Sequence, residues 1–319
     1  MKIHFGQQLN LNNSLTPHLI FIVGPTAIGK STLAIKLAEK LNGEIINADS
    51  MQVYSNLKIL TARPSEEDHK SIPHHLYGYI HGSIRYNVAN WCNDTIKIIE
   101  RNNKNKIYSI IVGGTGMYID KLLNGLFQIP SIPEVVKKDS EKLLSKIGID
   151  DFFDQVKNID KKSVNKISKN DTSRLRRIWE VHKYTNKTLS YWLNNNNKNY
   201  LSNQKYKLYL FTPNRKEIYN RVNNRFTKMI NCGAINEVKK LISLNLEKSL
   251  PIMRAHGVPE ISSYLEGSIT VDECILKGQQ VTRNYVKRQL TWWRSSTLDI
   301  QDCFNQFPSE IDINLLNLL

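Results

Sequence analysis

The sequence predicts an α/β fold: a parallel β-sheet flanked by helices, with a mainly helical domain inserted before its last strand. A short apolar run, Leu19 to Val23, leads into a glycine-containing loop and then into a segment with helical periodicity. A second apolar run follows directly, which completes a strand–helix–strand unit of the kind that builds parallel sheets. After Pro130 the composition becomes polar and charged, and a buried-strand pattern does not return until Lys207.

The first part of the chain alternates strand and helix patterns. Residues 31–41 repeat leucine on one helical face, and we expect this helix to stop at Gly43. Residues 44–48 form the second apolar run. Residues 109–112 (Ser-Ile-Ile-Val) are a third buried strand, which feeds a helix expected over residues 117–123. Together they predict at least three parallel strands with helices between them.

The inserted domain is predicted over residues 131–204, which are rich in Lys, Asn and Asp and have helical segments without buried-strand patterns. Residues 207–212 regain the strand pattern and are expected to rejoin the sheet. The core of the fold is therefore assigned to residues 18–130 and 205–300. Its last part is expected to hold three long helices, over residues 215–231 (ended by Gly233), 234–244 and 272–295.

The composition is that of a globular protein. The hydrophobic fraction is 40% and the charged fraction 23%, and no run reaches the roughly 20 apolar residues that a bilayer span needs. The first eighteen residues are polar and rich in Asn, unlike a signal peptide. We therefore expect a cytoplasmic protein without a membrane partner, and a monomer as the working expectation. The four cysteines lack metal-site spacing and are expected to be free thiols: Cys92, Cys232, Cys274 and Cys303.

The charge balance points to a polyanionic partner. The chain has 44 Lys and Arg against 29 Asp and Glu, a net charge of +15. A surplus of this size is typical of proteins that bind nucleic acid. Compositional drift in a sequence rich in Asn, Lys and Ile would give the same surplus. The placement of the basic residues is therefore needed to distinguish nucleic-acid binding from drift.

The loop after the first strand has the pattern G-x-x-x-x-G-K-S of a phosphate-binding P-loop. Glycines let backbone N–H groups turn toward a phosphate, and the following helix N-terminus adds partial positive charge. Lys30 would neutralise an outer phosphate, and the Ser31 hydroxyl is the candidate ligand of Mg²⁺. The fold prediction is therefore P-loop NTPase-like. Phosphate binding is assigned to the whole loop: Gly24, Pro25, Thr26, Ala27, Ile28, Gly29, Lys30 and Ser31.

A P-loop alone predicts an enzyme that uses and binds ATP or GTP. The strand end where such enzymes carry an acidic residue instead offers Gly113, Gly114 and Thr115. The acidic candidate is Asp49, at the end of the second strand, which faces the same crevice as the P-loop in this kind of sheet. It fits a water-mediated Mg²⁺ ligand, a general base and the N-cap of a following helix, and the local sequence does not separate these roles.

Nine stretches together resemble the tRNA dimethylallyltransferases, also called tRNA isopentenyltransferases, of bacterial type. They follow the family order: GPTAIGKS (24–31), DSMQVY (49–54), TARP (61–64), PHHL (73–76), VGGTGMY (112–118), NDTSRLRR (170–177), RVNNRFTKM (221–229), RAHGVPE (254–260) and TRNYVKRQLTWWR (282–294). Each is weak alone, but nine in order are specific. The sequence departs from the family pattern at Leu60, where glycine is usual, and at His81–Gly82–Ser83, where Asp-Pro-Ser is common.

The resemblance implies transfer of a dimethylallyl group from dimethylallyl diphosphate to N6 of adenosine 37, beside the anticodon, in tRNAs that decode codons beginning with U. Diphosphate would leave, with Mg²⁺ as cofactor. It implies catalytic roles for Asp49 as the base, Thr115 beside both reactants and Arg225 as a second cation on the diphosphate. From the residues alone, Arg225 also fits a solvated basic helix face, and Thr115 a helix cap.

The candidate tRNA contacts lie in several groups. The last long helix places Arg283, Lys287 and Arg294 within about 40° of one another on a helical wheel, beside an apolar stripe at positions 286, 290 and 293 that should pack on the body. A solvated charged face is the alternative to a stripe that follows phosphates. The inserted domain is expected to contact the anticodon stem-loop. The full set is Asp49, Ser50, Met51, Gln52, Thr115, Ser173, Arg174, Leu175, Arg176, Arg177, Arg254, Ala255, His256, Gly257, Val258, Pro259, Arg283 and Lys287.

Three other functions fit parts of the sequence. A P-loop kinase of small molecules explains residues 24–31 but neither the charge nor the C-terminal motifs. A relative that prenylates free adenine nucleotides would share the same reactive residues. A non-catalytic RNA-binding protein with a vestigial P-loop would not need to retain them.

Overall fold

The computed structural model describes residues 18–127, 129–165, 167–195, 197–198, 201 and 204–316. The described residues before 122 and after 202 form one compact unit, and residues 122–202 form the other. The second unit thus begins nine positions before the insertion expected from the sequence. Within the described part of the chain, no helix is long and apolar enough to cross a membrane. All four cysteines are free, as expected.

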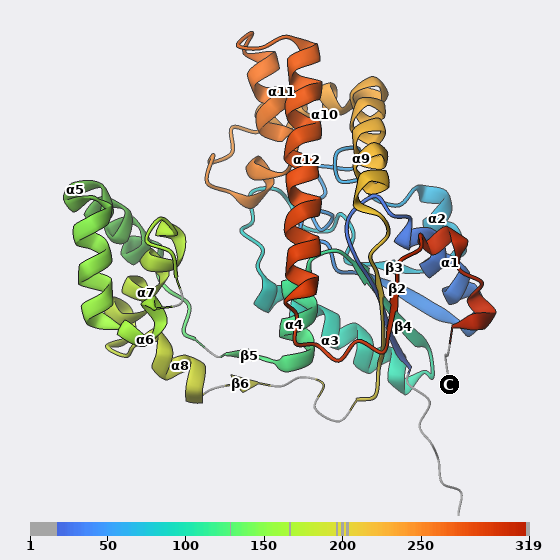
Figure 1. The fold of residues 1–319 in the computed structure, drawn as a ribbon, viewed down its shortest axis with the longest axis horizontal. Helices are drawn as coiled ribbons and strands as arrows, with labels where there is room; N and C mark the ends of the chain where they lie inside the picture. Colours follow the sequence, from blue (N-terminus) through green and yellow to red (C-terminus); the bar gives the residue numbers. More distant parts are fainter. Residues whose placement is uncertain are drawn as a thin grey trace, which may run out of the picture. The chain divides into compact units, whose positions relative to one another are not determined.

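The first unit is built on a six-stranded sheet in which every neighbouring pair is parallel, in the order β3-β2-β4-β1-β7-β8. Three of these strands, β2, β3 and β4, are labelled in Figure 1. The predicted parallel sheet is confirmed. The expected strand at residues 207–212 does rejoin it, pairing with β1 on the side opposite β4. The strands are β1 (Leu19–Val23), β2 (Gly43–Asn47), β3 (His74–His75), β4 (Tyr108–Gly113), β7 (Lys207–Phe211) and β8 (Asp302–Phe304).

The boundary predicted at residue 300 is wrong, because the edge strand β8 lies beyond it. Strand β8 pairs with β7 beyond that point, and Phe307 and Leu316 are buried in the core. The three residues of β8 have no alternating apolar pattern that would predict a strand, because their extended conformation depends on pairing with β7. The α/β core therefore extends past residue 300.

Helix and strand alternate through the first unit as expected, with one change at the end of the first helix. Asn42, in the left-handed conformation (φ 51°), ends this helix, and Gly43 instead opens β2. Asparagine tolerates this conformation, so glycine is not needed there. The helices, including one that crosses the unit boundary, are α1 (Lys30–Leu41), α2 (Glu66–Ser71), α3 (Val88–Lys104), α4 (Gly116–Asn124), α9 (Arg215–Met229), α10 (Ile235–Ile242), α11 (Val258–Leu265) and α12 (Val271–Arg294).

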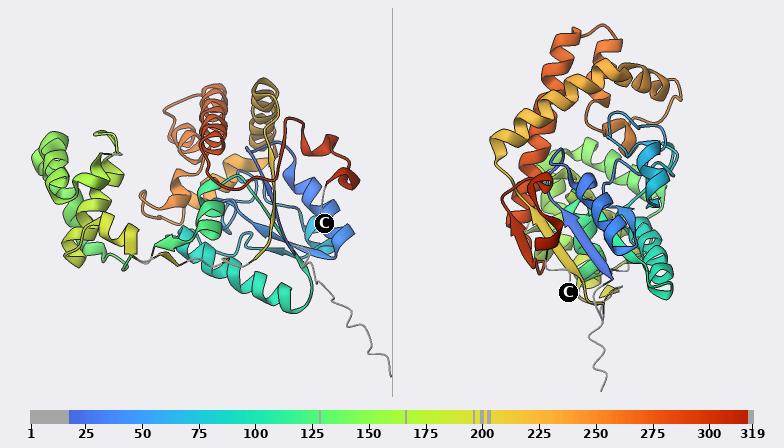
Figure 2. Two further views of the ribbon diagram at one scale, coloured as in Figure 1. Left: turned by 60° about the horizontal axis from the view of Figure 1, so that its bottom comes forward. Right: turned by 90° about the vertical axis from the view of Figure 1, so that its right-hand side faces the viewer.

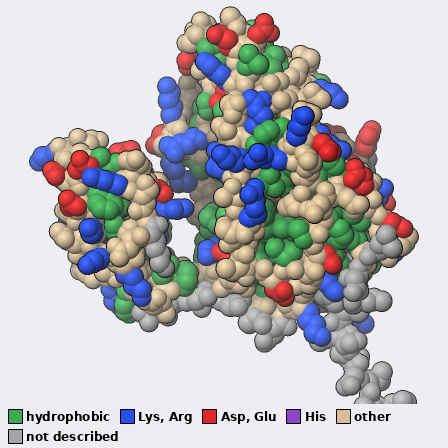
Figure 3. Space-filling view, viewed as in Figure 1, with side chains coloured by type: hydrophobic (Ala, Val, Ile, Leu, Met, Phe, Trp, Pro, Cys, Tyr) green, Lys and Arg blue, Asp and Glu red, His purple; other side chains and the backbone are tan. Residues whose placement is uncertain are grey.

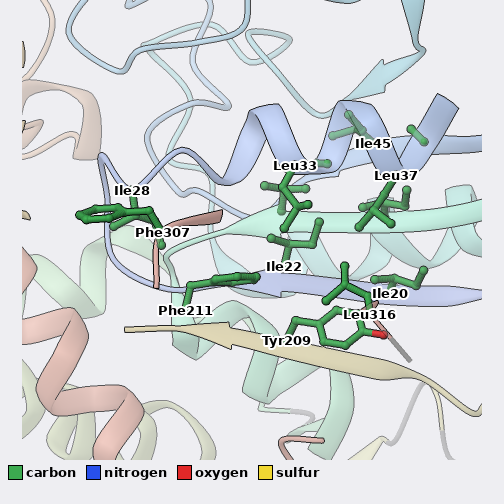
Figure 4. Close-up of a cluster of buried hydrophobic side chains, with 14 of the residues drawn as sticks. Ile20, Ile22, Ile28, Leu33, Leu37, Ile45, Tyr209, Phe211, Phe307 and Leu316 are labelled. Atoms are coloured by element: carbon green, nitrogen blue, oxygen red, sulfur yellow. The ribbon is translucent and has the colours of Figure 1, made fainter. Parts of the chain in front are cut away.

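One part of the core of the first unit lies between the sheet and α1. Ile20 and Ile22 of β1 are buried with Leu33 and Leu37 of α1, and with Phe211 of β7 (Figure 4). Burying a side chain of this size contributes about 1.5–3 kcal/mol relative to leaving it exposed. Both the strand before the P-loop and the helix after it are therefore fixed by packing, and the loop is held at both ends.

Helices α9 to α12 pack on one another and form a group beyond one edge of the sheet (Figures 1 and 2). The expected apolar stripe of α12 is confirmed, since Val286, Leu290 and Trp293 are all buried. Lys287 and Arg294 are exposed beside it, and Figure 3 shows Lys and Arg side chains gathered along this helix. Gly233 (φ 103°) lies in a wide turn, Ile230–Ala234, between α9 and α10.

The second unit is mainly helical and has its own core. Its helices are α5 (Glu134–Ile159), α6 (Lys161–Val164), α7 (Thr172–Thr185) and α8 (Leu189–Asn195), with a two-stranded ribbon of β5 (Leu126–Phe127) and β6 (Asn197–Lys198). Phe152, Leu175 and Ile178 are fully buried within it. Leu175 was a candidate RNA contact, but its side chain packs inside the unit and is not available at the surface.

Candidate active site

The P-loop adopts the tight turn that its sequence predicts. Gly24 has φ 146° and Gly29 has φ 91°, in the region that glycine favours. A Cβ on Gly24 would lie 2.3 Å from the carbonyl oxygen of Phe211, so no larger residue fits between β1 and β7. Lys30 opens α1, and its Nζ donates to the Pro25 carbonyl at 2.6 Å. Burial lowers the pKa of Lys30 to about 7, while nearby Asp49 raises it and Arg225 lowers it further.

Two adjoining cavities lie at the carboxyl ends of the strands, where β1 separates β4 from β7. Parallel sheets bind ligands at such a switch in strand order. Three residues line both cavities: Thr26, Asp49 and Arg225. The phosphate cavity, of about 140 Å³, is lined by Thr26, Ala27, Gly29, Lys30, Ser31, Asp49, Gln52, Ala62, Tyr77, Val112, Gly113, Gly114, Arg225 and Gln289. The second cavity, of about 160 Å³, is lined by Thr26, Asp49, Ser50, Met51, Leu60, Thr61, Val222, Arg225, Phe226, Met229, Arg254, Ala255, His256, Thr282 and Tyr285.

Asp49 lies in a turn and not at a helix N-terminus. Its Oδ1 accepts the Met51 N–H at 2.9 Å, and residues 51–53 continue as turns. The Asp49 N–H donates to Asn47 Oδ1 at 2.8 Å. These bonds hold the carboxylate between the two cavities and remove the helix-cap interpretation of this residue.

Thr115 joins the ends of β2 and β4. Its Oγ1 accepts the Ser50 N–H at 3.2 Å, and its own N–H donates to the Ala48 carbonyl at 3.2 Å. Tyr285 of α12 lies close to it: burial raises the pKa of Tyr285, the charge of Asp49 raises it further, and the neighbouring Thr115 and Gln289 side chains oppose that rise. Thr115 therefore ties the turn that carries Asp49 to the end of β4.

Arg225 points into the site from α9. Its Nη2 donates to Thr26 Oγ1 at 2.7 Å. Removal from solvent lowers the pKa of Arg225, and the charge of Asp49 opposes this effect. Its guanidinium therefore lies in the wall between the cavities and not on a solvated helix face.

Gln289 of α12 is a site residue that the sequence did not single out. Its Oε1 accepts the Thr26 N–H at 3.0 Å, and its Nε2 donates to the Gly114 carbonyl at 2.9 Å. The side chain is 5% exposed. Gln289 thus bridges the P-loop and the end of β4. Its position in the family-like stretch 282–294 was the one sequence feature that could have indicated a role in the site. Sequence spacing cannot show a contact between residues 263 positions apart.

The RNA-contact candidates of the first unit divide between the cavities and the surface. Arg254, Ala255 and His256 line the second cavity with Ser50 and Met51, while Gln52 lines the phosphate cavity. The centroids of the His256 and Tyr285 rings lie 4.6 Å apart. The exposed candidates Pro259 and Lys287 lie outside both linings.

Three other candidates in the first unit have structural contacts. Val258 is 1% exposed, so its side chain belongs to the core and is unavailable to RNA. Gly257, at φ 98°, caps α11, and its N–H donates to Glu260 Oε2. Arg283 donates to Asn223 and Gln280, and is half-buried.

The remaining candidates belong to α7 of the second unit. Ser173 and Arg174 are exposed, whereas Arg177 is half-buried. Arg176 donates to the Ser140 hydroxyl at 2.9 Å and to the Lys137 carbonyl at 3.1 Å. Arg176 therefore joins α7 to α5, and Ser173 and Arg174 are the more accessible members of this group.

The phosphate cavity offers oxygen ligands for a hard cation. The described residues contain no cluster of three or more His, Cys, Asp and Glu side chains that would hold a metal by itself. Ser31 and Asp49 both line the phosphate cavity. Mg²⁺ typically binds through one or two protein oxygens together with phosphate and water, so this donor set fits it.

Fold and site together define an α/β enzyme of the P-loop type, whose phosphate cavity adjoins a second cavity across Thr26, Asp49 and Arg225. The family model described as "IPP transferase" matches residues 52–296, and that described as "Isopentenyl transferase" matches residues 17–80. The chain belongs to the IPP transferase family.

Relatives and solved structures agree with this assignment. The tRNA dimethylallyltransferase of Wolbachia pipientis wMel is 42% identical over 95% of this chain and 97% of its own length. The tRNA dimethylallyltransferase of Pelagibacter ubique is 41% identical over 87% of this chain and 88% of its own length. The crystal structure of the tRNA isopentenylpyrophosphate transferase from Bacillus halodurans has a TM-score of 0.64 at 30% identity, covering 93% of this chain and 91% of its own. A eukaryotic dimethylallyltransferase described as acting on tRNA has a TM-score of 0.78 at 26% identity, and the match covers 93% of this chain and 76% of that protein's chain.

Proposed function

We propose that this protein transfers a dimethylallyl group from dimethylallyl diphosphate to N6 of adenosine 37 in tRNAs that decode codons beginning with U. Family membership supports prenyl transfer to tRNA. The observation that supports this assignment most is the shared wall of Thr26, Asp49 and Arg225. A donor with its diphosphate in the phosphate cavity would present its first carbon at that wall, facing a nucleophile in the second cavity.

The chemistry follows from the groups at that wall. The N6 lone pair attacks the first carbon of the donor, the carbon–oxygen bond breaks, and its electron pair leaves with the diphosphate. The amine is a weak nucleophile because its lone pair is delocalised into the ring, so removing its proton assists attack. The Asp49 carboxylate, held by Met51 and Asn47, is the proposed acceptor of that proton.

Cations at the phosphate cavity would stabilise the leaving group. Arg225 lies at the cavity wall, and Lys30 has a pKa of about 7 before an anion is bound. A diphosphate beside Lys30 favours the charged ammonium and raises that pKa. Negative charge grows on the diphosphate as the bond breaks, and preorganised cations stabilise such a change. Mg²⁺ bound through Ser31 and the diphosphate would add to this neutralisation.

The second cavity is also the proposed entrance for the target base. A base must leave its stack to reach a reactive group, and the unpaired bases of an anticodon loop do so at lower cost. The His256 and Tyr285 rings and the exposed Arg254 lie on this side of Asp49. We place the enzyme in the cytoplasm and expect it to act as a monomer, which light scattering of the purified protein tests.

The direct test is incubation of the protein with tRNA, Mg²⁺ and labelled dimethylallyl diphosphate, without ATP. We expect the label to appear in tRNA, with strong preference for species carrying adenosine 37 and decoding codons that begin with U. An unlabelled tRNA pool, together with ATP-dependent phosphorylation of a small acceptor, would instead establish a kinase. Transfer to free AMP without transfer to tRNA would identify a nucleotide prenyltransferase.

A further inference from the structure

Arg288 is an exposed residue of α12 that lines neither cavity but contacts a residue that does. Its Nη2 lies 3.2 Å from Nε2 of His256, which lines the second cavity. Arginine has only N–H donors, so the Nε2 atom has to accept this hydrogen bond. A histidine whose Nε2 accepts carries its proton on Nδ1. The contact with Arg288 therefore selects one form of the imidazole, neutral and with Nδ1 as the donor.

The surroundings of His256 favour this neutral form. Burial lowers the pKa of His256, the charge of Arg288 lowers it further, and the charge of Asp49 opposes these two effects. Protonation would also place an N–H on Nε2, directly against the guanidinium N–H of Arg288. The ring of Tyr285 packs on the imidazole, with 4.6 Å between the two centroids. The His256 ring is therefore fixed in orientation and in tautomer before a ligand enters.

The second nitrogen of the imidazole is available to a ligand. Among the residues that the structure describes, Nδ1 of His256 has no hydrogen-bond partner, and it does not belong to the unpartnered polar atoms that are buried from solvent. An N–H group in this position can donate to a ligand in the second cavity. Asp49 lines the same cavity, and its carboxylate can only accept. The cavity thus offers one acceptor and one donor.

An acceptor together with a donor matches the polar edge of adenine around its exocyclic amine. The amine donates, and the ring nitrogens on either side of it, N1 and N7, accept. Guanine carries an acceptor oxygen in place of the amine, which the Asp49 carboxylate would repel. We propose that Arg288 is a positioning residue that holds His256 as a neutral Nδ1–H donor to a ring nitrogen of the target adenine, N1 or N7. This inference rests on the proposed function and adds a group that distinguishes adenine from guanine.

The tautomer of His256 can be measured without any substrate. In protein labelled with ¹⁵N-histidine, the side-chain nitrogen shifts distinguish the Nδ1–H form from the Nε2–H form, and the spectrum of His256→Asn identifies the signals of His256. We expect the Nδ1–H form in the unmodified protein and a mixture of both forms in Arg288→Met. The matched control is Lys287→Met, which removes one positive charge from the neighbouring exposed position and should leave the tautomer unchanged. A charged or Nε2–H imidazole in the unmodified protein, or an unchanged tautomer in Arg288→Met, would overturn the role of Arg288.

The hydrogen bond to the base is tested by changing both of its partners. The substrates are anticodon stem-loop hairpins with adenosine, 1-deazaadenosine or 7-deazaadenosine at position 37, and each deaza base replaces one acceptor nitrogen by C–H. His256→Phe keeps a ring against Tyr285 but has no N–H, so it reports the effect of each analogue on reactivity alone. One of the two analogues should lower kcat/KM about tenfold more with the unmodified protein than with His256→Phe, as expected when a polar group of the site is left unpaired.

Arg288→Met gives the same test from an exposed position outside the cavity linings. It should reduce that extra loss from about tenfold to about threefold, whereas Lys287→Met should retain it. Equal sensitivity of the unmodified protein and these variants to both analogues would overturn the hydrogen bond to the ring nitrogen, although all of them modify natural adenosine. A protein that binds the hairpins but transfers no prenyl group to natural adenosine would contradict the proposed function instead, and the tautomer measurement would still decide the role of Arg288.

Discussion

Truncating Gln289 to alanine removes two hydrogen bonds that join the P-loop to the end of β4. The Gly114 carbonyl would lose a buried donor, and the Thr26 N–H would lose a partner beside the cavities. Leaving a buried group unsatisfied costs about 1–3 kcal/mol, and losing a more accessible bond about 0.5–1.5 kcal/mol. The expected loss of stability is therefore about 3 kcal/mol. For a unit of this size, that lowers Tm by about 6–12 °C.

The same change should loosen the P-loop before the donor binds. We expect KM for dimethylallyl diphosphate to rise about tenfold, equivalent to about 1.4 kcal/mol, because part of the ordering energy must then be supplied by binding. Differential scanning calorimetry and steady-state transfer assays measure the two effects. The control is Thr291→Ala, an exposed polar residue of the same helix, which should change stability by no more than about 0.5 kcal/mol. An unchanged Tm and an unchanged KM in Gln289→Ala would refute the bridging role.

Two further predictions concern charge. Since the pKa of Lys30 is about 7 against an ordinary 10.5, the unfolded chain binds a proton in that window that the folded protein does not, and unliganded stability should rise with pH across it. The affinity for diphosphate should fall as the pH rises above about 7, and binding at pH 8 should be accompanied by proton uptake. Calorimetry in buffers of different ionisation enthalpy measures the affinity and the proton uptake. A Lys30→Met protein with the same proton uptake would contradict the assignment of the lowered pKa to Lys30. Lys287→Ala, at an exposed position on α12, should weaken tRNA binding and reduce its salt slope by about one unit; an unchanged slope would place the RNA elsewhere.

The local parts of the fold could be predicted from local patterns. The strand from Leu19 to Val23 is apolar throughout, and the P-loop glycines and the leucine repeat after them each have a direct physical meaning. The apolar stripe of α12 was predicted for the same reason, because helical periodicity identifies the face that packs. These features depend on neighbouring residues in the chain, so a single sequence is enough to find them.

The parts that were not predicted depend on contacts between distant residues. Strand β8 exists because β7 offers an edge, and Gln289 becomes a site residue only when α12 reaches the P-loop. Leu175 and Val258 show the opposite case. They lie in stretches that resemble a tRNA-binding family, but both side chains are buried, and a motif does not separate residues that pack from residues that contact a ligand.

The central claim is that Asp49 removes a proton from an adenosine amine while the P-loop holds a leaving diphosphate. The most direct measurement is mass spectrometry of anticodon-loop nucleosides from tRNA incubated with dimethylallyl diphosphate and Mg²⁺, using the unmodified protein and Asp49→Asn. We predict N6-dimethylallyladenosine at position 37 with the unmodified protein, and a rate about 10²–10⁴-fold lower with Asp49→Asn, the range typical for losing a general base, while tRNA binding is kept. Equal rates for the two proteins would remove Asp49 from the chemistry, and the absence of the modified nucleoside with both would contradict the proposed reaction.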